Sequence, residues 1–324
     1  MIRWGLCCQF LDAPIRFRSA THRYVSTLTP KARREYLGAI ARDNAAALMA
    51  AVHHCRALGI GAFRINSQVL PLGTHPVSGY GLDRIDRTGE ARRTFLEAAA
   101  LAKQLDVRLS FHPDQFVVLN SEREAVVESS LREVEFQAEI AELVGADVIV
   151  LHGGGAAGGK EAALARLTRA VERLSGRVRG RLAIENDDRM FAPADLLPVC
   201  ARLGIPLVYD VHHHRCNGDG LSEREATTRA VATWGHREPY FHISSPRAGW
   251  QGDAPRPHAD YIDPSDLPQG WMRIDVTVDV EAKAKERAVL ALMAQLSEMA
   301  APIRRASRPI SRSMPAGDTR NPQK

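Results

Sequence analysis

Six short apolar segments of the chain each end on a residue that can bind a metal ion. The segment ends are Phe111-His112, Leu151-His152, Ile184-Glu185, Tyr209-Asp210, Phe241-His242 and Val280-Glu281. A single His or Glu at the end of a strand carries little information, whereas a series spaced one strand-and-helix unit apart indicates a shared site. In a parallel barrel all strand carboxyl ends open on one face, so such residues converge there however far apart they lie in sequence. The pattern predicts a site for several metal ions.

Two more imidazoles belong with this set. One comes from His212-His213-His214, directly after Asp210, and spacing alone does not choose among the three. The other is His258, in the long loop Arg256-Pro257-His258-Ala259-Asp260-Tyr261. The candidates are then five histidines and three carboxylates, whereas one tetrahedral site takes three or four protein ligands. The number indicates two or three ions, with Glu185 central enough to bridge two of them.

The ligand types restrict both the metal and the chemistry. Imidazole and carboxylate without thiolate suit Mn²⁺ or Zn²⁺, and Mg²⁺ less well. A cluster of such ions holds a phosphate, lowers the pKa of a bound water and stabilises a leaving oxygen. Hydrolysis of a phosphodiester needs all three effects, so the site predicts a nuclease.

Two other classes of function remain as alternatives. A sugar isomerase or epimerase on the same barrel needs only Glu185, Asp210, His242 and Glu281 around one or two ions, and the remaining histidines are then surplus. A non-catalytic DNA- or metal-binding protein is disfavoured because the ligand set is complete.

The elements that must position these residues alternate along the chain. Candidate strands span 2–8, 61–66, 107–112, 147–152, 181–185, 206–210, 240–244 and 272–280, and helical patterns span 31–57, 90–105, 122–144, 160–176, 192–203, 221–235 and 281–299. Strands such as Val148-Ile149-Val150-Leu151 are apolar on both faces, which suits parallel strands inside a barrel. The series favours an α/β fold, a single (β/α)₈ TIM barrel in residues 1–300. An open doubly wound sheet would not bring six successive strand ends around one point.

The clearest helix is expected to begin with a capping box. Ser121-Glu122-Arg123-Glu124 has the spacing with which a Ser and a Glu satisfy free amides of the first turn. One buried stripe is expected to follow at three- and four-residue steps, made of Val127, Leu131, Val134, Ala138 and Ala141.

Composition narrows the class of protein further. The formal net charge is +5 and the isoelectric point near 9.1, which is compatible with a polyanionic partner. The sequence contains no run of about 18 apolar residues, the length needed to span a bilayer. Its N-terminal segment lacks the pattern of a secretory signal. Five cysteines do not form a disulfide framework, so a cytoplasmic protein with reduced thiols is expected. The basic segment 301–324, rich in Pro, Ser and Arg, is expected to be disordered.

Several ordered motifs make the chain resemble a known family over residues 1 to 296. They are Phe63-Arg64-Ile65-Asn66-Ser67, Leu70-Pro71, His112-Pro113-Asp114-Gln115-Phe116, Leu151-His152-Gly153-Gly154, Ile184-Glu185-Asn186-Asp187-Asp188, Asp210-Val211-His212-His213-His214, His242-Ile243-Ser244-Ser245, His258-Ala259-Asp260-Tyr261 and Glu281-Ala282-Lys283-Ala284-Lys285-Glu286. In this order they resemble the UV damage endonuclease family (UvdE/UvsE), whose xylose-isomerase-like barrel is shared with endonuclease IV.

The resemblance implies a divalent-metal endonuclease, typically Mn²⁺-dependent, that acts in DNA repair. Such an enzyme nicks duplex DNA immediately 5′ of an ultraviolet photoproduct or an abasic site and leaves a 3′-hydroxyl. A monomer acting in the cytoplasm at the nucleoid, without a nucleotide cofactor or a membrane, is expected. The family's metal-ligand positions are matched by His112, His152, Glu185, Asp210, His213, His242, His258 and Glu281, of which His112, His152, Glu185, Asp210 and Glu281 are expected to be catalytic.

Other residues are expected to touch DNA. Gln115 and Phe116 match a polar–aromatic pair that probes the duplex at the lesion, and a flat ring can fill the gap left by flipped nucleotides. Arg64 and His75, after the second strand, could contact a phosphate.

The chain departs from the family pattern at three positions. Phe116 stands where a Tyr is common, and Leu6 stands where some members have a Tyr near the lesion pocket. Tyr240 stands two residues before His242, where members carry a Lys that can be modified. These departures bear on lesion range and metal preference more than on the class of reaction.

Overall fold

Eight parallel strands form the centre of the molecule in this computed structural model, which describes residues 1–306. They are β1 (Ile2–Cys7), β2 (Ala62–Ile65), β3 (Arg108–Phe111), β4 (Val148–His152), β5 (Leu182–Glu185), β6 (Leu207–Val208), β7 (Tyr240–Ile243) and β8 (Val276–Val280). The order β6-β5-β4-β3-β2-β1-β8-β7 leaves β6 and β7 at its two ends. An isolated parallel bridge between Asp210 and His242 joins those ends, so the barrel is nearly closed. The predicted (β/α)₈ fold is confirmed.

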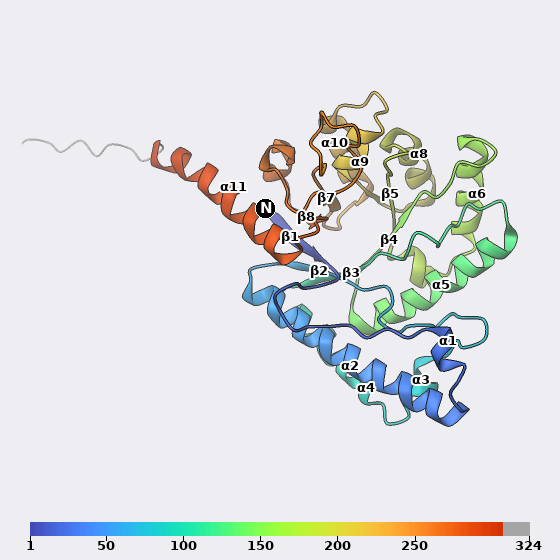
Figure 1. Cartoon of the computed structure of the whole chain (residues 1–324). Helices are drawn as coiled ribbons and strands as arrows, with labels where there is room; N and C mark the ends of the chain where they lie inside the picture. The colour runs from blue at the N-terminus through green and yellow to red at the C-terminus, as the bar shows by residue number, and fades with distance from the viewer. Residues whose placement is uncertain (307–324) are drawn as a thin grey trace, which may run out of the picture.

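Helices cover the outside of the strands (Figure 1). They are α1 (His22–Val25), α2 (Pro30–Ala57), α3 (Leu82–Ile85), α4 (Glu90–Gln104), α5 (Glu124–Val144), α6 (Lys160–Glu172), α7 (Gly176–Arg179), α8 (Pro193–Leu203), α9 (Val211–Cys216), α10 (Glu223–Thr233) and α11 (Glu286–Ala306). The four short helices α1, α3, α7 and α9 were not predicted, because four to six residues are too few to show a helical apolar period. No helix of the described residues is long and apolar enough to cross a membrane.

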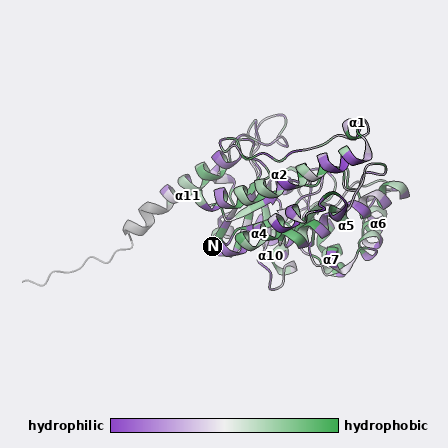
Figure 2. Cartoon of the chain, turned by 90° about the horizontal axis from the view of Figure 1, so that it is seen from below, coloured by the Kyte–Doolittle hydropathy of each residue, from purple (hydrophilic) through white to green (hydrophobic). Residues whose placement is uncertain are grey.

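Strand β4 is buried on both faces, which explains why its sequence is apolar at successive positions. Ile149 and Leu151 belong to the large core between the barrel and its helices. Val148 and Val150 point the other way, into a second cluster that includes Trp234. Since side chains alternate along a strand, burial on both faces requires an apolar residue at every position. On the helices, hydrophilic and hydrophobic residues alternate in bands, as Figure 2 shows for α2 and α5.

Helix α5 confirms the predicted stripe and corrects the predicted cap. All five stripe residues, from Val127 to Ala141, are buried. The helix begins at Glu124, however, and its N-cap residue Arg123 makes no side-chain capping bond. Ser121 therefore lies before the first turn, where its hydroxyl accepts a hydrogen bond from the Arg123 amide at 3.2 Å. The capping box predicted at Ser121 and Glu124 is wrong, because the helix starts two residues too late for it.

Three boundaries near the C-terminus also differ from expectation. The last strand was predicted from 272, but residues Gln269–Arg273 form a 3₁₀ turn and β8 starts at Val276. The last helix was predicted to begin at 281, yet α11 begins at Glu286, so Glu281 is free of helical geometry. The same helix ends at Ala306, inside the segment 301–324 that was expected to be disordered. Residues 307–324 of that segment lie outside the described residues.

Candidate metal centre

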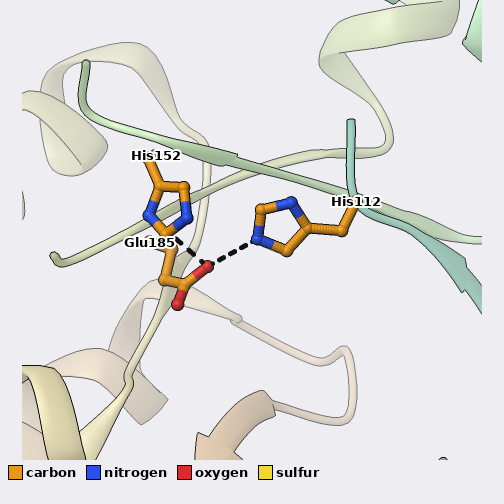
Figure 3. A group of neighbouring side chains, drawn as sticks. All are labelled: His112, His152 and Glu185. Atoms are coloured by element: carbon orange, nitrogen blue, oxygen red, sulfur yellow. Dashed lines mark hydrogen bonds and ion pairs between the residues drawn. The ribbon is translucent and has the colours of Figure 1, made fainter. Parts of the chain in front are cut away.

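Glu185 lies at the middle of a cluster of histidines at the carboxyl ends of the strands. Its Oε2 lies 2.9 Å from Nε2 of His112 and 3.7 Å from Nδ1 of His152 (Figure 3). Its Oε1 lies 3.0 Å from Nδ1 of His242 and 3.3 Å from Nδ1 of His213. Four of the five predicted histidines thus contact one carboxylate that is 1% exposed. This is the position expected of a bridging ligand.

Three groups of side chains have the mutual distances of metal ligands. They are His112, His152 and Glu185; Glu185, Asp210 and His213; and Asp210, His242 and Glu281, with ligand atoms within 4.8 Å of one another in each group. The groups are joined because Glu185 belongs to two of them and Asp210 to two. His258 lies at the edge of the third group, with Nδ1 3.7 Å from Oε2 of Glu281. All eight predicted ligands are therefore brought together, and three linked groups match the expected two or three ions.

The cluster contains buried polar atoms that the described residues leave without hydrogen-bond partners. They include His152 Nδ1, Glu185 Oε1, Asp210 Oδ2, His242 Nδ1 and His242 Nε2. Buried polar atoms are normally paired, since an unpaired one costs free energy. Ligation of divalent cations would pair these imidazole and carboxylate atoms, and the three groups contain no thiolate. The residues present fit divalent metal ions.

Burial and neighbouring charges shift the pKa values of the cluster. Burial raises the pKa of the Glu185 carboxyl, but His242 and His152 outweigh it and hold that pKa well below its usual range. Burial lowers the pKa of His242, but the carboxylates of Glu185 and Glu281 outweigh it and raise that pKa to about 9. For His213, Asp210 and Glu185 likewise outweigh burial and raise the pKa well above its usual value. Without metal, the ionised Glu185 carboxylate therefore lies next to protonated His242 and His213, whereas burial lowers the pKa of His152.

The short helix α9 explains why His213, rather than its neighbours, reaches the cluster. Asp210 is the N-cap of α9, and its Oδ1 accepts a hydrogen bond from the His213 amide at 2.7 Å. Nδ1 of His213 also donates to the Asn186 carbonyl oxygen at 2.9 Å. His214 is turned away, toward the Tyr209 hydroxyl at 2.8 Å. The helical turn thus presents His213 to the cluster, as the resemblance implied.

Asparagine side chains fix the loops that carry the ligands. The Asn186 side chain forms two hydrogen bonds with the backbone of Asp210. Its Nδ2 donates to the Asp210 carbonyl oxygen at 2.9 Å, and its Oδ1 accepts from the Asp210 amide at 3.0 Å. Asn120 donates to the carbonyl oxygens of Gly153 and Gly155 at 2.8 and 2.7 Å, directly after His152. Sequence reasoning missed both roles. Asn186 had a signal, because it follows Glu185 directly, whereas Asn120 lies on a different loop from the one it holds.

Arg64 lies beneath the cluster and contacts one of its ligands. Its Nη1 donates to Oε1 of Glu281 at 2.6 Å, and its Nε lies 3.7 Å from Oδ2 of Asp279. Burial lowers the pKa of Arg64, but Cys7 and Glu281 outweigh it and keep the guanidinium charged. Arg64 also lines a cavity together with His112, His152 and Glu281, so its expected contact with a DNA phosphate stays a prediction. Asp279 was not predicted, although a carboxylate within Val276-Thr277-Val278-Asp279-Val280 was a signal.

The expected DNA-probing residues separate into two places. Gln115 and Phe116 lie on the loop after β3 and line a cavity of about 420 Å³ together with His112, His152 and Glu281. Gln115 also lines a neighbouring cavity of about 630 Å³ that reaches His213 and His258. The Phe116 side chain is 80% exposed beside the metal centre.

His75 lies outside both cavities. Its ring stacks on His22 with centroids 4.1 Å apart, and Nδ1 accepts hydrogen bonds from the amides of Val77 and Ser78. The cavity that contains the metal ligands is therefore not the place where His75 could meet a phosphate.

The other two departures from the family pattern are buried. Leu6 is fully buried in the core. Tyr240 is also fully buried, with its hydroxyl 2.7 Å from the Ser110 hydroxyl and its ring 5.9 Å from that of His242. Burial raises the pKa of Tyr240 well above its usual value, so its hydroxyl stays neutral.

Comparisons with known proteins agree with this architecture. The sequence model of a family described as UV-endonuclease UvdE matches residues 2–309. A UV DNA damage endonuclease of Deinococcus radiodurans is 35% identical over 304 residues, covering 89% of this chain and 93% of that protein. The crystal structure of SacUVDE superposes with a TM-score of 0.81 at 27% identity, covering 92% of this chain and 99% of that one. Endonuclease IV from Thermus thermophilus superposes with a TM-score of 0.60 at 18% identity, covering 91% and 99%, which shows a shared fold.

Proposed function

The chain belongs to the UV-endonuclease UvdE family, and from that premise we propose that it is a divalent-metal-dependent enzyme that hydrolyses the DNA phosphodiester directly 5′ of a lesion. The lesions are ultraviolet photoproducts and abasic sites. The observation that supports this most is the convergence of eight imidazole and carboxylate side chains, several with buried atoms that form no hydrogen bond within the described residues. One chain supplies all eight ligands, which supports the proposal of a monomeric enzyme. Genomic DNA as substrate places it in the cytoplasm, at the nucleoid.

The residues of the centre have separate tasks. Glu185 and Asp210 each belong to two ligand groups, so both would help to hold more than one ion. The ions, Mn²⁺ in this proposal, would bind the phosphate and lower the pKa of the attacking water. Gln115 and Phe116 stand at the edge of the same cavity, where a ring can stack in the gap left by flipped nucleotides. Cleavage is thereby directed to duplexes whose stacking is already weakened.

One nicking assay tests the proposal. Three duplexes of the same sequence, carrying a defined photoproduct, an abasic site or no lesion, are incubated with purified protein and Mn²⁺, Zn²⁺ or Mg²⁺ in turn. The lesion strand should be cut on its 5′ side and leave an end that a polymerase extends, while the undamaged duplex is spared. Failure to cut any duplex with any metal would contradict the proposal, and activity on a monosaccharide would favour the isomerase alternative.

Replacement of the central carboxylate tests whether the metal centre is responsible. Glu185→Gln preserves the size of the side chain but removes the charge that four histidines contact. We expect nicking to fall by at least about 100-fold, since loss of residues that merely orient ligands already costs 10–100-fold. Glu97→Gln, at an exposed position of α4, is the matched control and should be fully active.

A further inference from the structure

A second hollow of the surface, separate from the metal centre, is rich in arginine. Its volume is about 560 Å³, and Arg33, Arg34, Arg84 and Arg87 line it. We call it the arginine groove. Arg33 and Arg34 lie near the start of α2, Arg84 lies in α3 and Arg87 follows α3. Asp83 is the one carboxylate among the lining residues.

These four arginines are not neutralised by carboxylates within residues 1–306. None of them forms an ion pair with a carboxylate of the described residues, whereas other surface arginines do so, such as Arg177 with Glu142 at 3.0 Å. Arg33 instead donates from Nε to the Val25 carbonyl oxygen at 3.0 Å, and Arg34, Arg84 and Arg87 are exposed. Clustered like charges repel one another, so a bound anion would stabilise this surface.

The groove lies on the same side of the barrel as the metal centre. Asn66 and Ser67, at the start of the loop after β2, line the metal-site cavity, and Val77–Tyr80 of the same loop line the groove. Helices of such a barrel run antiparallel to the strands, so the first turn of α2 belongs to the side where the strands end. Figure 1 shows this end of α2 beside α1 and α3, and Figure 2 shows it as strongly hydrophilic.

The loop between the two sites is held in one shape. The Tyr80 hydroxyl donates to the Pro71 carbonyl oxygen at 2.7 Å, and the Tyr80 amide donates to the Gly73 carbonyl oxygen at 3.0 Å. A Cβ at Gly79 would lie 2.6 Å from the His75 carbonyl oxygen, so the chain passes too closely there for any larger residue. The groove is therefore formed before any partner binds.

We propose that the arginine groove binds the phosphate backbone of the duplex that flanks the lesion. The inference rests on the proposed function, since DNA held at the metal centre must extend over one side of the barrel mouth. Guanidinium groups bind phosphate with two parallel hydrogen bonds, and each phosphate contact releases counterions. A continuous polyanion can place successive phosphates against the arginines of α2 and α3 together. The groove adds affinity and orientation without reading sequence.

Binding measurements with two double variants test the inference. Arg34→Ala with Arg84→Ala removes two charges from the groove. The matched control, Arg56→Ala with Lys103→Ala, removes two exposed charges from the C-terminal ends of α2 and α4. For a long undamaged duplex we expect the groove variant to bind roughly tenfold more weakly and the slope of log K against log salt to become shallower by about 2. The control should match the unmodified protein, and equal affinities and slopes for both variants would overturn the inference.

A series of duplexes shortened on one side of the lesion or the other locates the effect. The affinity difference between the groove variant and the unmodified protein should vanish when one flank is short and persist when the other is short. A difference that ignores flank length would overturn the inference, because it would place the effect outside the flanking duplex. Nicking at saturating substrate tests the proposed function separately. If the protein nicks no lesion but the affinity difference still depends on the flank, the proposed function is refuted and the inference that the arginine groove binds DNA is retained.

Discussion

The buried guanidinium of Arg64 holds Glu281 in position beneath the metal centre and also lies near the buried Asp279. Arg64 contacts both carboxylates, and neither oxygen of Asp279 has a hydrogen-bond partner among the described residues. The space around Asp279 is tight, since a Cβ at Gly5 would lie 2.1 Å from its Oδ1. Arg64 is a positioning residue in this arrangement, because it acts on the metal through Glu281.

Substitution of Arg64 by Lys separates charge from geometry. The lysine ammonium keeps the positive charge but lacks the planar guanidinium with which Arg64 contacts Glu281 and Asp279 together. We expect the affinity for Mn²⁺ to fall about 10- to 100-fold, as for other residues that orient a metal ligand. Titration of Mn²⁺ followed by electron paramagnetic resonance measures this directly. Arg42→Lys, at a surface pair with Glu90, is the control, and unchanged Mn²⁺ affinity in Arg64→Lys would remove the positioning role.

Tyr240 makes a different prediction, because its hydroxyl contacts Ser110 rather than a metal ligand. Tyr240→Phe leaves the buried Ser110 hydroxyl without its partner at 2.7 Å, so the free energy of unfolding should fall by about 1–2 kcal/mol. Adding Ser110→Ala should recover part of that loss, since no unpaired group then remains. Urea unfolding measures both. Nicking by Tyr240→Phe should be unchanged, and a large loss of activity at normal stability would show that the hydroxyl takes part in the reaction.

At the scale of elements, the loop after β4 depends on one glycine. Gly154 has a φ of +85°, and a Cβ there would lie 2.2 Å from Oδ1 of Asn120. Asn120 cannot move aside without losing its bonds to Gly153 and Gly155. The position is closed to any side chain for reasons of both backbone conformation and space.

A pair of glycine substitutions tests this loop. Gly154→Ala should lower the free energy of unfolding by about 2–4 kcal/mol, through strain and the loss of the Asn120 contacts. Gly155→Ala is the matched control, because a Cβ at Gly155 meets nothing within 4 Å, and it should leave stability nearly unchanged. Thermal unfolding of the two variants checks the difference. Equal stability of both would show that the loop has room to adjust.

The sequence predicted best the strands whose burial requires a run of apolar residues. It predicted least well the features that depend on single contacts, such as a helix cap or the partner of a buried charge. Strands β4 and β5 could be predicted because burial on both faces requires unbroken apolar runs, and the strand ends then located the ligands. The start of α5 could not be predicted, since Ser121 and Glu124 have the spacing of a capping box whether or not the helix begins between them. The ion pair of Arg64 could not be predicted, because sequence does not say which distant side chain a residue at a strand end will meet. Its true partner, Glu281, lies 217 residues away.

For the whole molecule, the charges of the metal centre link stability, pH and metal binding. Burial lowers the pKa of His242, but Glu185 and Glu281 outweigh it and raise the pKa from 6.5 to about 9. A histidine whose pKa is higher in the folded than in the unfolded state stabilises the fold fully below pH 6.5, and this contribution is lost as pH rises through about 9. The metal-free protein should therefore become less stable across that range.

Metal binding should have the opposite dependence, because a ligating imidazole must first lose its proton. We expect the apparent Mn²⁺ affinity to rise from pH 6.5 to about 9, and each binding event below pH 9 to release protons. Thermal unfolding of chelator-treated protein across this range, and Mn²⁺ titration with a pH indicator, measure the two halves of the linkage. His242→Gln should abolish much of both effects, since no proton is then held between Glu185 and Glu281. Metal-free stability that is flat with pH, together with binding that releases no protons, would show that the imidazole is already neutral and that another cation balances the two carboxylates.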